Sequence, residues 1–482
     1  MQIASTQEIR RAEQAAFAAG SSTPSELMDA VVTRLCREVT GTPQRVVAYI
    51  GRGNNGGDAV GLAASFCCQV ILRHPGESFR VSAETRRQLD NSCCMEETAT
   101  AAEPEADTLI IDGLLGTGAH GELTGEYAAC VQEMNALRLS APRCRTLAID
   151  IPSGLGTSLC VQADATAAIG CVKPEALADG AEDFVGRLHC IPLPEVDIPA
   201  ECADTVLEPL HPLCRLPRRP YSLYKNRAGR VAVVAGSRGY LGAAQMCAEA
   251  AVRAGAGLVA LYCHEDMYPL LAARVAPEVM VRPVKSYAEI SEPDAQCLLM
   301  GPGLGAVAGA EADALHALAM DFPGTVVLDA DALNLAAARG WAFHERCILT
   351  PHPGEMQRLD PRPAAPRRET VRRFLERHNC TLLLKGARSI AANRTHACYN
   401  STGGPFMANG GQGDTLSGCI AALAAQGLGR LHAAALGAYA CGLAAETVQA
   451  AGRGTHTVRA TQVADALPAV LASLHPGAHS CE

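Results

Sequence analysis

The chain has 482 residues, which at about 150 residues per domain predicts two or three domains. Lys and Arg total 41 against 50 Asp and Glu, so the formal net charge of −9 excludes a chain-wide nucleic-acid surface, which needs a basic excess. Hydrophobic residues make up 48% and charged residues 19%, a mixture that excludes a wholly disordered chain.

The 21 cysteines do not predict a disulfide framework. Their number is odd, the chain is long, and no C-x-x-C pair occurs in it. The opening MQIASTQEIRR has no apolar stretch after its charges, and the longest apolar run, Leu431–Ala445, is too short to span a bilayer. We therefore expect a cytoplasmic protein without membrane contact, whose thiols pack as small apolar residues.

Short β-branched runs alternate with Ala-rich stretches, which is the βαβ pattern of a doubly wound α/β domain. A first helix is predicted to begin at Ser5, where Glu8 three residues later completes a capping box. Most runs are apolar throughout, as expected of parallel strands covered on both faces. In the first half the predicted strands are Arg45–Ile50, Gln69–Arg73, Thr108–Asp112, Arg145–Ile149 and Ala165–Cys171.

Seven prolines between Pro192 and Pro220 interrupt this pattern, so we place a domain boundary there, with domains at 1–212 and 220–482. The Arg/Pro-rich stretch Asp360–Arg373 is interpreted as a loop and a solvated helix face. The prediction is two tandem α/β domains, the first a Rossmann-like doubly wound parallel sheet. The strands predicted after the boundary are Arg230–Ala235, Gly257–Tyr262, Cys297–Met300, Thr325–Asp329, Cys347–Thr350 and Thr381–Leu384.

The first predicted strand runs into the motif GRGNNGGD, residues Gly51–Asp58, and a helix is expected to begin near Ala59. Three of the glycines satisfy G-x-G-x-x-G, and backbone N–H groups at a helix N-terminus suit a phosphate. The next strand ends in Arg73-His74, where an ordinary dehydrogenase has an acidic residue that holds the ribose. Amide and carboxylate oxygens gathered in one turn favour a site for a hard cation or a ribose over a simple helix start.

Two further strands of the first domain run into polar, glycine-rich segments, DGLLGTG at residues 112–118 and DIPSG at residues 150–154. In an open parallel sheet, ligands bind beyond the carboxyl ends of the strands. We therefore expect Asp58, Asp112 and Asp150 to converge on one site.

These segments, followed by Lys173-Pro174, resemble the epimerase domain of NAD(P)H-hydrate repair enzymes over roughly residues 1–194. That family interconverts the R and S forms of hydrated NADH and NADPH and uses a bound potassium ion. The resemblance implies that Asp150 is catalytic and faces the hydrated ring, since inverting a carbinolamine carbon needs proton transfer by a positioned carboxylate. It implies potassium ligands at Asn55, Asp112 and Ser153. It also implies substrate contacts by Asn54, Asn55, Gly56, Gly57 and Asp58 and by a phosphate loop of Gly116, Thr117, Gly118, Ala119, His120, Gly121 and Glu122.

In the second domain, Gly, Asp or His again follow the predicted strands, at GSRGYLGA, GPGLG, DADALN and TPHPGE. The sharpest signal is NGGQGDT, Asn409–Thr415, which opens a helix with glycines whose N–H groups converge on one point. Asp414 at that point is a candidate general base towards a hydroxyl. The segment Lys385–Ser389 lies between two predicted short strands and is expected to place a cation and backbone donors on nucleotide phosphates.

The G-x-G-D arrangement looks like the ribokinase-like fold, and the motifs from about Lys225 to Pro468 resemble the nucleotide-dependent NAD(P)H-hydrate dehydratase. The resemblance implies loss of water from the S epimer at the expense of ADP, giving AMP and phosphate, with magnesium as a further cofactor. Asp414 would be catalytic, because a phosphorylated hydroxyl is a better leaving group than hydroxide. The implied substrate contacts are Ala243, Gly303, His352 and Asp414, and the implied nucleotide contacts are Lys385, Gly386, Ala387, Arg388, Ser389 and Gly413.

The hypothesis is a bifunctional repair enzyme that binds single dinucleotides and ADP and forms a homo-oligomer. One alternative is a ribokinase-like small-molecule kinase with an accessory N-terminal domain, which predicts a phosphorylated product and no loss of water. Another gives the first domain a dinucleotide-sensing role without catalysis. His352 and its LTPHPGE segment favour the dehydratase, and Asp150 with the proposed cation ligands favours catalysis. The choice between ADP and ATP stays open.

Overall fold

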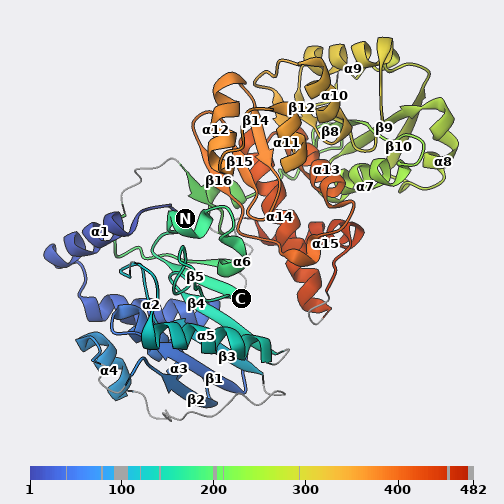
Figure 1. Cartoon of the computed structure of the whole chain (residues 1–482). Coiled ribbons are helices and arrows are strands. Elements are labelled where there is room, and N and C mark those ends of the chain that lie inside the picture. The colour runs from blue at the N-terminus through green and yellow to red at the C-terminus, as the bar shows by residue number, and fades with distance from the viewer. Residues whose placement is uncertain are drawn as a thin grey trace. The chain divides into compact units, whose positions relative to one another are not determined.

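The computed structural model forms two compact units, Met1–Val206 and Leu207–Glu482 (Figure 1). The structure describes residues 1–39, 41–76, 80–91, 107–119, 121–140, 143–198, 204–209, 211–292, 294–452 and 456–475.

The first unit is built on a six-stranded sheet in the order β2-β1-β3-β4-β5-β6, in which every neighbouring pair is parallel. Its strands are β1 (Arg45–Ile50), β2 (Gln69–Arg73), β3 (Thr108–Gly113), β4 (Cys144–Ile149), β5 (Ala165–Ile169) and β6 (Arg187–Ile191), with a short β7 (Thr205–Val206) where the unit ends. Its helices are α1 (Thr6–Ala18), α2 (Pro24–Glu38), α3 (Asn54–Ala64), α4 (Ala83–Asn91), α5 (Gly125–Ser140), the one-turn η1 (Pro174–Leu177) and α6 (Glu182–Val185).

Both faces of this sheet are covered, which explains why its strands are apolar throughout. Val46 and Ala48 of β1 pack in a cluster with side chains of α1, α2 and α3. Val47 and Tyr49 point to the opposite face and pack with side chains of α5. The strand order reverses direction between β1 and β3, which is where doubly wound sheets of this order bind ligands. The GRGNNGGD and DGLLGTG segments follow these two strands.

The second unit orders its strands β10-β9-β8-β11-β12-β13-β14-β15-β16. The pairs are parallel from β10 to β14, and the last two, β14 with β15 and β15 with β16, are antiparallel. The reversal of strand order falls between β8 and β11, which again predicts a ligand site beyond their carboxyl ends. The strands are β8 (Arg230–Val234), β9 (Leu258–His264), β10 (Val279–Val284), β11 (Cys297–Met300), β12 (Thr325–Leu328), β13 (Cys347–Leu349), β14 (Thr381–Leu384), β15 (Ile390–Ala392) and β16 (Ala397–Tyr399).

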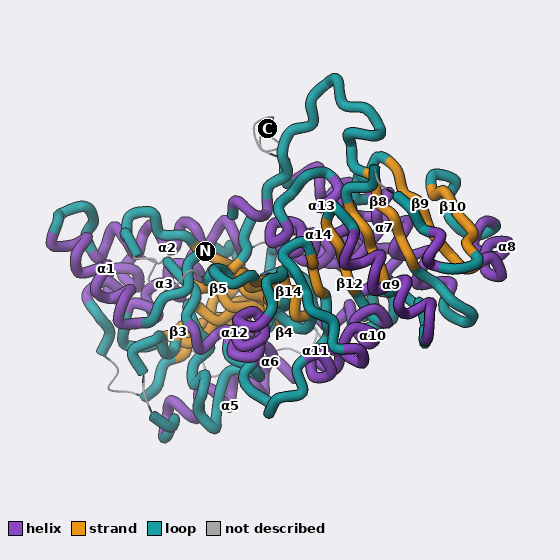
Figure 2. Tube along the Cα trace, turned by 90° about the horizontal axis from the view of Figure 1, so that it is seen from above, coloured by secondary structure: helices purple, strands orange, loops and turns teal. Residues whose placement is uncertain are grey.

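Helices cover both faces of this second sheet as well. Side chains of α7, α13 and α14 pack in one core cluster with the strands. Figure 1 shows α7 and α13 below the strands and α9 and α10 above them, and Figure 2 shows the same strands from above. The α-helices are α7 (Leu241–Arg253), α8 (Tyr268–Ala272), α9 (Gly309–Asp321), α10 (Asp331–Arg339), α11 (Pro353–Leu359), α12 (Arg367–Arg377), α13 (Gln412–Ala425), α14 (Arg430–Ala451) and α15 (Ala460–Ser473). The short 3-10 turns are η2 (Pro212–Cys214), η3 (Glu265–Met267), η4 (Tyr287–Glu289) and η5 (Pro405–Met407).

The sequence predictions of fold class and of the main strands are confirmed, and so is the capping box that begins α1 with Ser5 and Glu8. The predicted start of α3 near Ala59 is wrong, because the helix begins at Asn54 and the motif forms its first turns. The strands that were not predicted include the short β7 and β16, β6, where polar side chains interrupt the apolar run, and β10, which contains Pro283. A proline is tolerated there because β10 is the edge of its sheet.

The sequence predicts cysteines that pack as free thiols and no membrane contact, and both predictions can be compared with the described residues. Every cysteine in those ranges is free, and most of them are buried. Among the same residues, no helix is both long and apolar enough to cross a bilayer.

Candidate functional sites

The turn after β1 brings three stretches of backbone into close contact. A Cβ placed on Gly51 would lie 1.8 Å from the carbonyl oxygen of Leu114, and one on Gly56 would lie 2.3 Å from the carbonyl oxygen of Gly51. Since no side chain fits at either position, glycine is required by close approach. The first turn of α3 therefore lies directly against the segment that follows β3.

The three predicted potassium ligands lie in one hydrogen-bonded cluster. The Oγ of Ser153 donates to Asp112 Oδ1 at 2.6 Å and lies 3.3 Å from the carbonyl oxygen of Leu115. Asn55 Nδ2 donates to the same carbonyl at 3.1 Å. Burial raises the pKa of Asp112 to about 6, although hydrogen bonds from Ser153 and Leu114 oppose that rise. Carboxylate, hydroxyl, amide and carbonyl oxygens are the donors that a hard cation prefers, so this set fits one.

Asp150 follows β4 in a conformation that few non-glycine residues adopt, with φ of 69°. Its carboxylate forms an ion pair with Lys173, whose side chain is 3% exposed. The lysine ammonium also donates to the carbonyl oxygens of Ile169 at 2.9 Å and Cys171 at 3.3 Å. Backbone strain concentrated at a buried charged pair is typical of a functional position.

Asp58 of α3 belongs to the same cluster of charges. Its Oδ1 is buried and has no hydrogen-bond partner among the described residues. Burial raises the pKa of Asp58 well above its ordinary value, and the charges of Asp150 and Glu13 raise it further. An unpaired buried carboxyl oxygen is costly unless something else binds it, which marks Asp58 as a candidate ligand contact.

The predicted phosphate loop follows β3 and reaches the start of α5. Gly116 lies against Asn55, since a Cβ placed there would be 3.5 Å from Asn55 Cβ. Glu122 at the far end accepts from the backbone N–H of Ser158 at 3.1 Å, and the hydrogen bonds from Ser158 lower the pKa of Glu122. Thr117, Gly118, Ala119 and Gly121 are described between them, whereas His120 lies outside the described residues.

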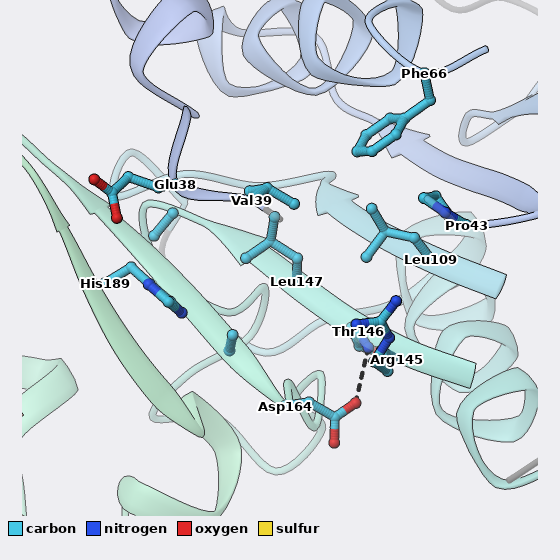
Figure 3. Close-up of a pocket in the computed structure, with 12 residues that line it drawn as sticks. Glu38, Val39, Pro43, Phe66, Leu109, Arg145, Thr146, Leu147, Asp164 and His189 are labelled. Atoms are coloured by element: carbon cyan, nitrogen blue, oxygen red, sulfur yellow. Dashed lines mark hydrogen bonds between the residues drawn. The ribbon is translucent and has the colours of Figure 1, made fainter. Parts of the chain in front are cut away.

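The first unit also contains a cavity of about 270 Å³ at the amino ends of its strands (Figure 3). Leu109, Leu147 and Ala165 line it together with Phe66 and His189. Burial lowers the pKa of His189 to about 4, so its imidazole is neutral. The motif residues lie at the opposite, carboxyl ends of the strands, so this cavity is not the predicted dinucleotide site.

In the second unit, the segments after β8 and β11 touch at the reversal of strand order. The N–H of Gly236 donates to the carbonyl oxygen of Pro302 at 2.9 Å. Gly303 has φ of 58°, and a Cβ there would lie 2.7 Å from the carbonyl oxygen of Tyr240 and 2.9 Å from Ala243 Cβ. The structure therefore brings the predicted substrate contacts Ala243 and Gly303 together.

Lys385, at the end of β14, is surrounded by carboxylates. Its Nζ donates to Asp329 Oδ1 at 2.7 Å and lies 3.7 Å from Glu355 Oε2. Burial acts to lower the pKa of Lys385, but the negative charges of Asp329 and Glu355 raise it above its ordinary value. The two carboxylates therefore fix the ammonium group of Lys385 in position at the carboxyl ends of the strands.

The first turn of α13 lies beside this lysine. A Cβ placed on Gly413 would be 3.5 Å from Lys385 Nζ and 4.0 Å from Asp329 Oδ2. Burial raises the pKa of Asp414 to about 7, and the charges of Asp329 and Asp331 raise it while Lys385 lowers it. A carboxylate with a pKa near neutrality at a helix N-terminus is suited to general acid/base work.

The other predicted contacts of the second unit have mainly local partners. His352 caps α11, and its Nδ1 accepts from the N–H groups of Gly354 at 3.0 Å and Glu355 at 3.3 Å. The turn Gly386–Ser389 is held by Arg367, which donates to the carbonyl oxygens of Ala387 and Arg388. The side chain of His352 is 52% exposed and its Nε2 lies 3.4 Å from Glu355 Oε1, so it borders the lysine cluster while capping its helix.

Among the charged residues of these sites, Lys173, Asp329 and Glu355 were not assigned from the sequence, although all three lie in segments quoted for the resemblance. Their position directly after apolar strands or in a helix-opening turn is the signal that would have found them. Among the described residues, no group of three or more His, Cys, Asp or Glu could hold a metal ion. The proposed potassium set contains one carboxylate and otherwise offers neutral side chains.

Comparisons with known proteins match both units. The profile described as NAD(P)H-hydrate dehydratase matches residues 231–469, and the profile of the YjeF-related protein N-terminus matches residues 25–175. A bifunctional NAD(P)H-hydrate repair enzyme from Leishmania infantum is 33% identical, covering 90% of this chain and 86% of that protein. Its namesake from Escherichia coli K12 is also 33% identical, covering 96% of this chain and 93% of that protein.

One solved structure resembles the second unit. A ribokinase-like superfamily protein from Enterococcus faecalis is 26% identical with a TM-score of 0.51, covering 57% of this chain and 97% of that one.

Proposed function

The chain belongs to the family of bifunctional NAD(P)H-hydrate repair enzymes, an epimerase joined to a dehydratase, and we propose which of its residues perform each step. The epimerase is assigned to residues 1–212 and the dehydratase to residues 220–482. The observation that carries the proposal is the cluster of Asp414, Lys385 and Asp329, in which the pKa of Asp414 is raised to about 7.

In the second unit, Asp414 removes the proton from the ring hydroxyl of the S hydrate, and the oxygen attacks the terminal phosphorus of ADP. AMP leaves, the ring nitrogen expels the phosphate, and loss of a ring proton restores the reduced nicotinamide. Lys385 and the N–H groups at the start of α13, including that of Gly413, stabilise the transferring phosphoryl group. Ala243 and Gly303 line the nicotinamide side, with His352 at its border. Gly386, Ala387, Arg388 and Ser389 bind the rest of the nucleotide.

In the first unit, Asp150 takes the hydroxyl proton of the hydrated ring as the C–N bond opens, and a proton reaches the ring nitrogen. After rotation of the carbonyl group formed on ring opening, reversal of these proton transfers closes the ring as the other epimer. Lys173 holds the Asp150 carboxylate in its strained position and is a positioning residue. Asn54 and Asp58, with Gly56 and Gly57, bind the dinucleotide, and the loop at residues 116–122 binds its phosphates.

Two cations complete the proposal. Potassium would be held by Asn55, Asp112 and Ser153, which share one hydrogen-bonded cluster with the carbonyl of Leu115. When bound, it would supply positive charge beside the dinucleotide. Magnesium would accompany the phosphates of the nucleotide, since it is usually held by one or two carboxylates and substrate phosphates. Asp329 and Glu355 already pair with Lys385, so the phosphates of the nucleotide would supply most of its ligands.

The test uses the full chain with racemic hydrated NADH, ADP, potassium and magnesium. Recovery of reduced-nicotinamide absorbance from both epimers is the expected result. Recovery of only the S half would leave the dehydratase alone, and a phosphorylated product without loss of water would support the kinase instead. The homo-oligomer stays a prediction, which sedimentation of the full chain checks.

The dehydratase should lose activity on the acidic side of neutrality. Because the pKa of Asp414 is about 7, the basic carboxylate form is lost as the pH falls below that value, and kcat/KM should fall with it. Asp329→Asn removes a charge that raises this pKa and frees Lys385 to lower it. The midpoint of the pH profile of kcat/KM should therefore move to lower pH. The exposed Asp321 at the end of α9 supplies the control, Asp321→Asn, which should leave the midpoint in place. A profile unchanged in Asp329→Asn would contradict this assignment.

The epimerase should depend on potassium through Asp112. In the wild-type chain, exchanging potassium for a large organic cation should slow epimerisation by roughly tenfold, the effect typical of a disturbed metal site. Asp112→Asn should be slow in either salt, since its side chain no longer carries the charge. Dehydration of the pure S hydrate, measured in the same preparations, is the control for folding. An Asp112→Asn variant that still responds fully to potassium would refute the ligand set.

A further inference from the structure

Helix α1 carries none of the motifs, yet two of its side chains face the site of the first unit. A Cβ placed on Gly118 would lie 2.6 Å from Nη2 and 3.8 Å from Cζ of Arg10, so the guanidinium group lies against the backbone of the phosphate loop. Glu13 lies three residues further along the same face of the helix. Its carboxyl group interacts electrostatically with Asp150 and Lys173. This face of α1 therefore borders both the phosphate loop and the catalytic carboxylate.

The rotation of α1 about its axis is set by packing. Ile9, Ala12 and Ala16 are buried in the core of the unit, and the capping box at Ser5 fixes where the helix begins. These contacts present Arg10 outward beside the loop. Arg10 itself is exposed, and its charge acts to lower the pKa of Glu13 on the same helix. Among the described residues its guanidinium has no hydrogen bond or ion pair within contact distance, so its donors are accessible to a ligand.

The charge of the site favours a second cation besides the proposed potassium. Asp58, Asp150 and Glu13 place three carboxyl groups beside one another, and the ammonium of Lys173 is already paired with Asp150. A pyrophosphate approaching these groups carries further negative charge and is repelled unless a cation offsets it. A guanidinium presents planar, paired donors that match phosphate oxygens.

We propose that Arg10 binds the pyrophosphate of the hydrated dinucleotide, completing from α1 an anion site whose other donors are the backbone N–H groups of Gly116, Thr117 and Gly118. The inference rests on the proposed epimerase function of this unit. Both hydrates carry the pyrophosphate, whereas only the NADPH hydrate carries a 2′-phosphate. Arg10 should therefore contribute equally to binding of the two.

The test measures conversion of the R to the S hydrate by the full chain without nucleotide, with the epimers separated by chromatography and the spontaneous rate subtracted. Arg10→Ala should raise KM about tenfold for both hydrates, the effect of losing one charge-assisted hydrogen bond, and should leave kcat within about twofold. Arg10→Lys should recover part of the loss. The neighbouring Arg11 is also exposed on α1, so Arg11→Ala is the matched control and should behave as wild type.

Each other outcome has one meaning. A KM raised only for the NADPH hydrate would place Arg10 on the 2′-phosphate and overturn the pyrophosphate assignment. An unchanged KM in Arg10→Ala, with Asp150→Asn inactive, would overturn the inference and leave the epimerase site intact. Full activity in Asp150→Asn would instead remove the proposed function on which the inference rests. Thermal unfolding of each variant checks that α1 remains packed.

Discussion

Replacing Asp414 with asparagine should reduce dehydration of the S hydrate by about three orders of magnitude, within the range known for loss of a general base. Asparagine keeps the shape of the side chain but cannot accept the hydroxyl proton. The measurement is the return of reduced-nicotinamide absorbance from pure S hydrate with ADP and magnesium.

Epimerisation by the same Asp414→Asn protein is the internal control, because Asp414 belongs to the second unit. It should continue at the wild-type rate. Binding of ADP should also persist, since Lys385 and the helix N-terminus remain. Wild-type dehydration by Asp414→Asn would show that another group takes the proton, and loss of both activities would indicate a folding defect that Asp414→Glu must then resolve.

The second large effect is expected at Asp150. Asp150→Asn should slow epimerisation by about two orders of magnitude or more, because the ring hydroxyl loses its proton acceptor. Asparagine is the preferred substitution for a physical reason. Position 150 has φ of 69°, a conformation that Asn tolerates far better than Ala. The change therefore tests the chemistry without adding backbone strain.

With racemic hydrate and ADP, the Asp150→Asn protein should restore the S half at the normal rate and then continue only as fast as the R form epimerises spontaneously. A parallel sample without protein gives that spontaneous rate. A biphasic recovery is thus the expected trace, against a single phase for wild type. If both halves return together in Asp150→Asn, the acid/base role of Asp150 is wrong.

The sequence predicted the positions of most strands, because a strand buried on both faces needs a continuous run of buried, mostly apolar residues. A run such as Thr381–Leu384 has three consecutive leucines after its first residue and forms β14, buried at every position, over that same range. The unpredicted strand β10 lacks such a run, since it carries Arg282 and Pro283 at an exposed sheet edge. Local pattern therefore predicts interior strands better than edge strands.

The start of α3 shows the opposite case, in which local pattern misled. Two glycines and two asparagines in a row indicate a turn, yet the helix already begins at Asn54. Gly56 is in the helix because its neighbour in space is the backbone of Gly51, and no side chain fits between them. Packing between segments, which the sequence does not display, outweighs the low helix propensity of glycine.

The sequence by itself determined the two α/β domains, the segments at the strand ends and the candidate bases Asp150 and Asp414. Each of these depends on residues close together in the chain and on the rule that parallel strands present their carboxyl ends at one edge. Only the tertiary structure decided which charges meet there. Lys385 pairs with Asp329 across 56 residues of sequence, Lys173 pairs with Asp150, and Arg10 reaches the loop at Gly118. Such contacts are set by how distant strand ends and helices pack, because charge interactions depend on distance in space and leave no periodic pattern along the chain.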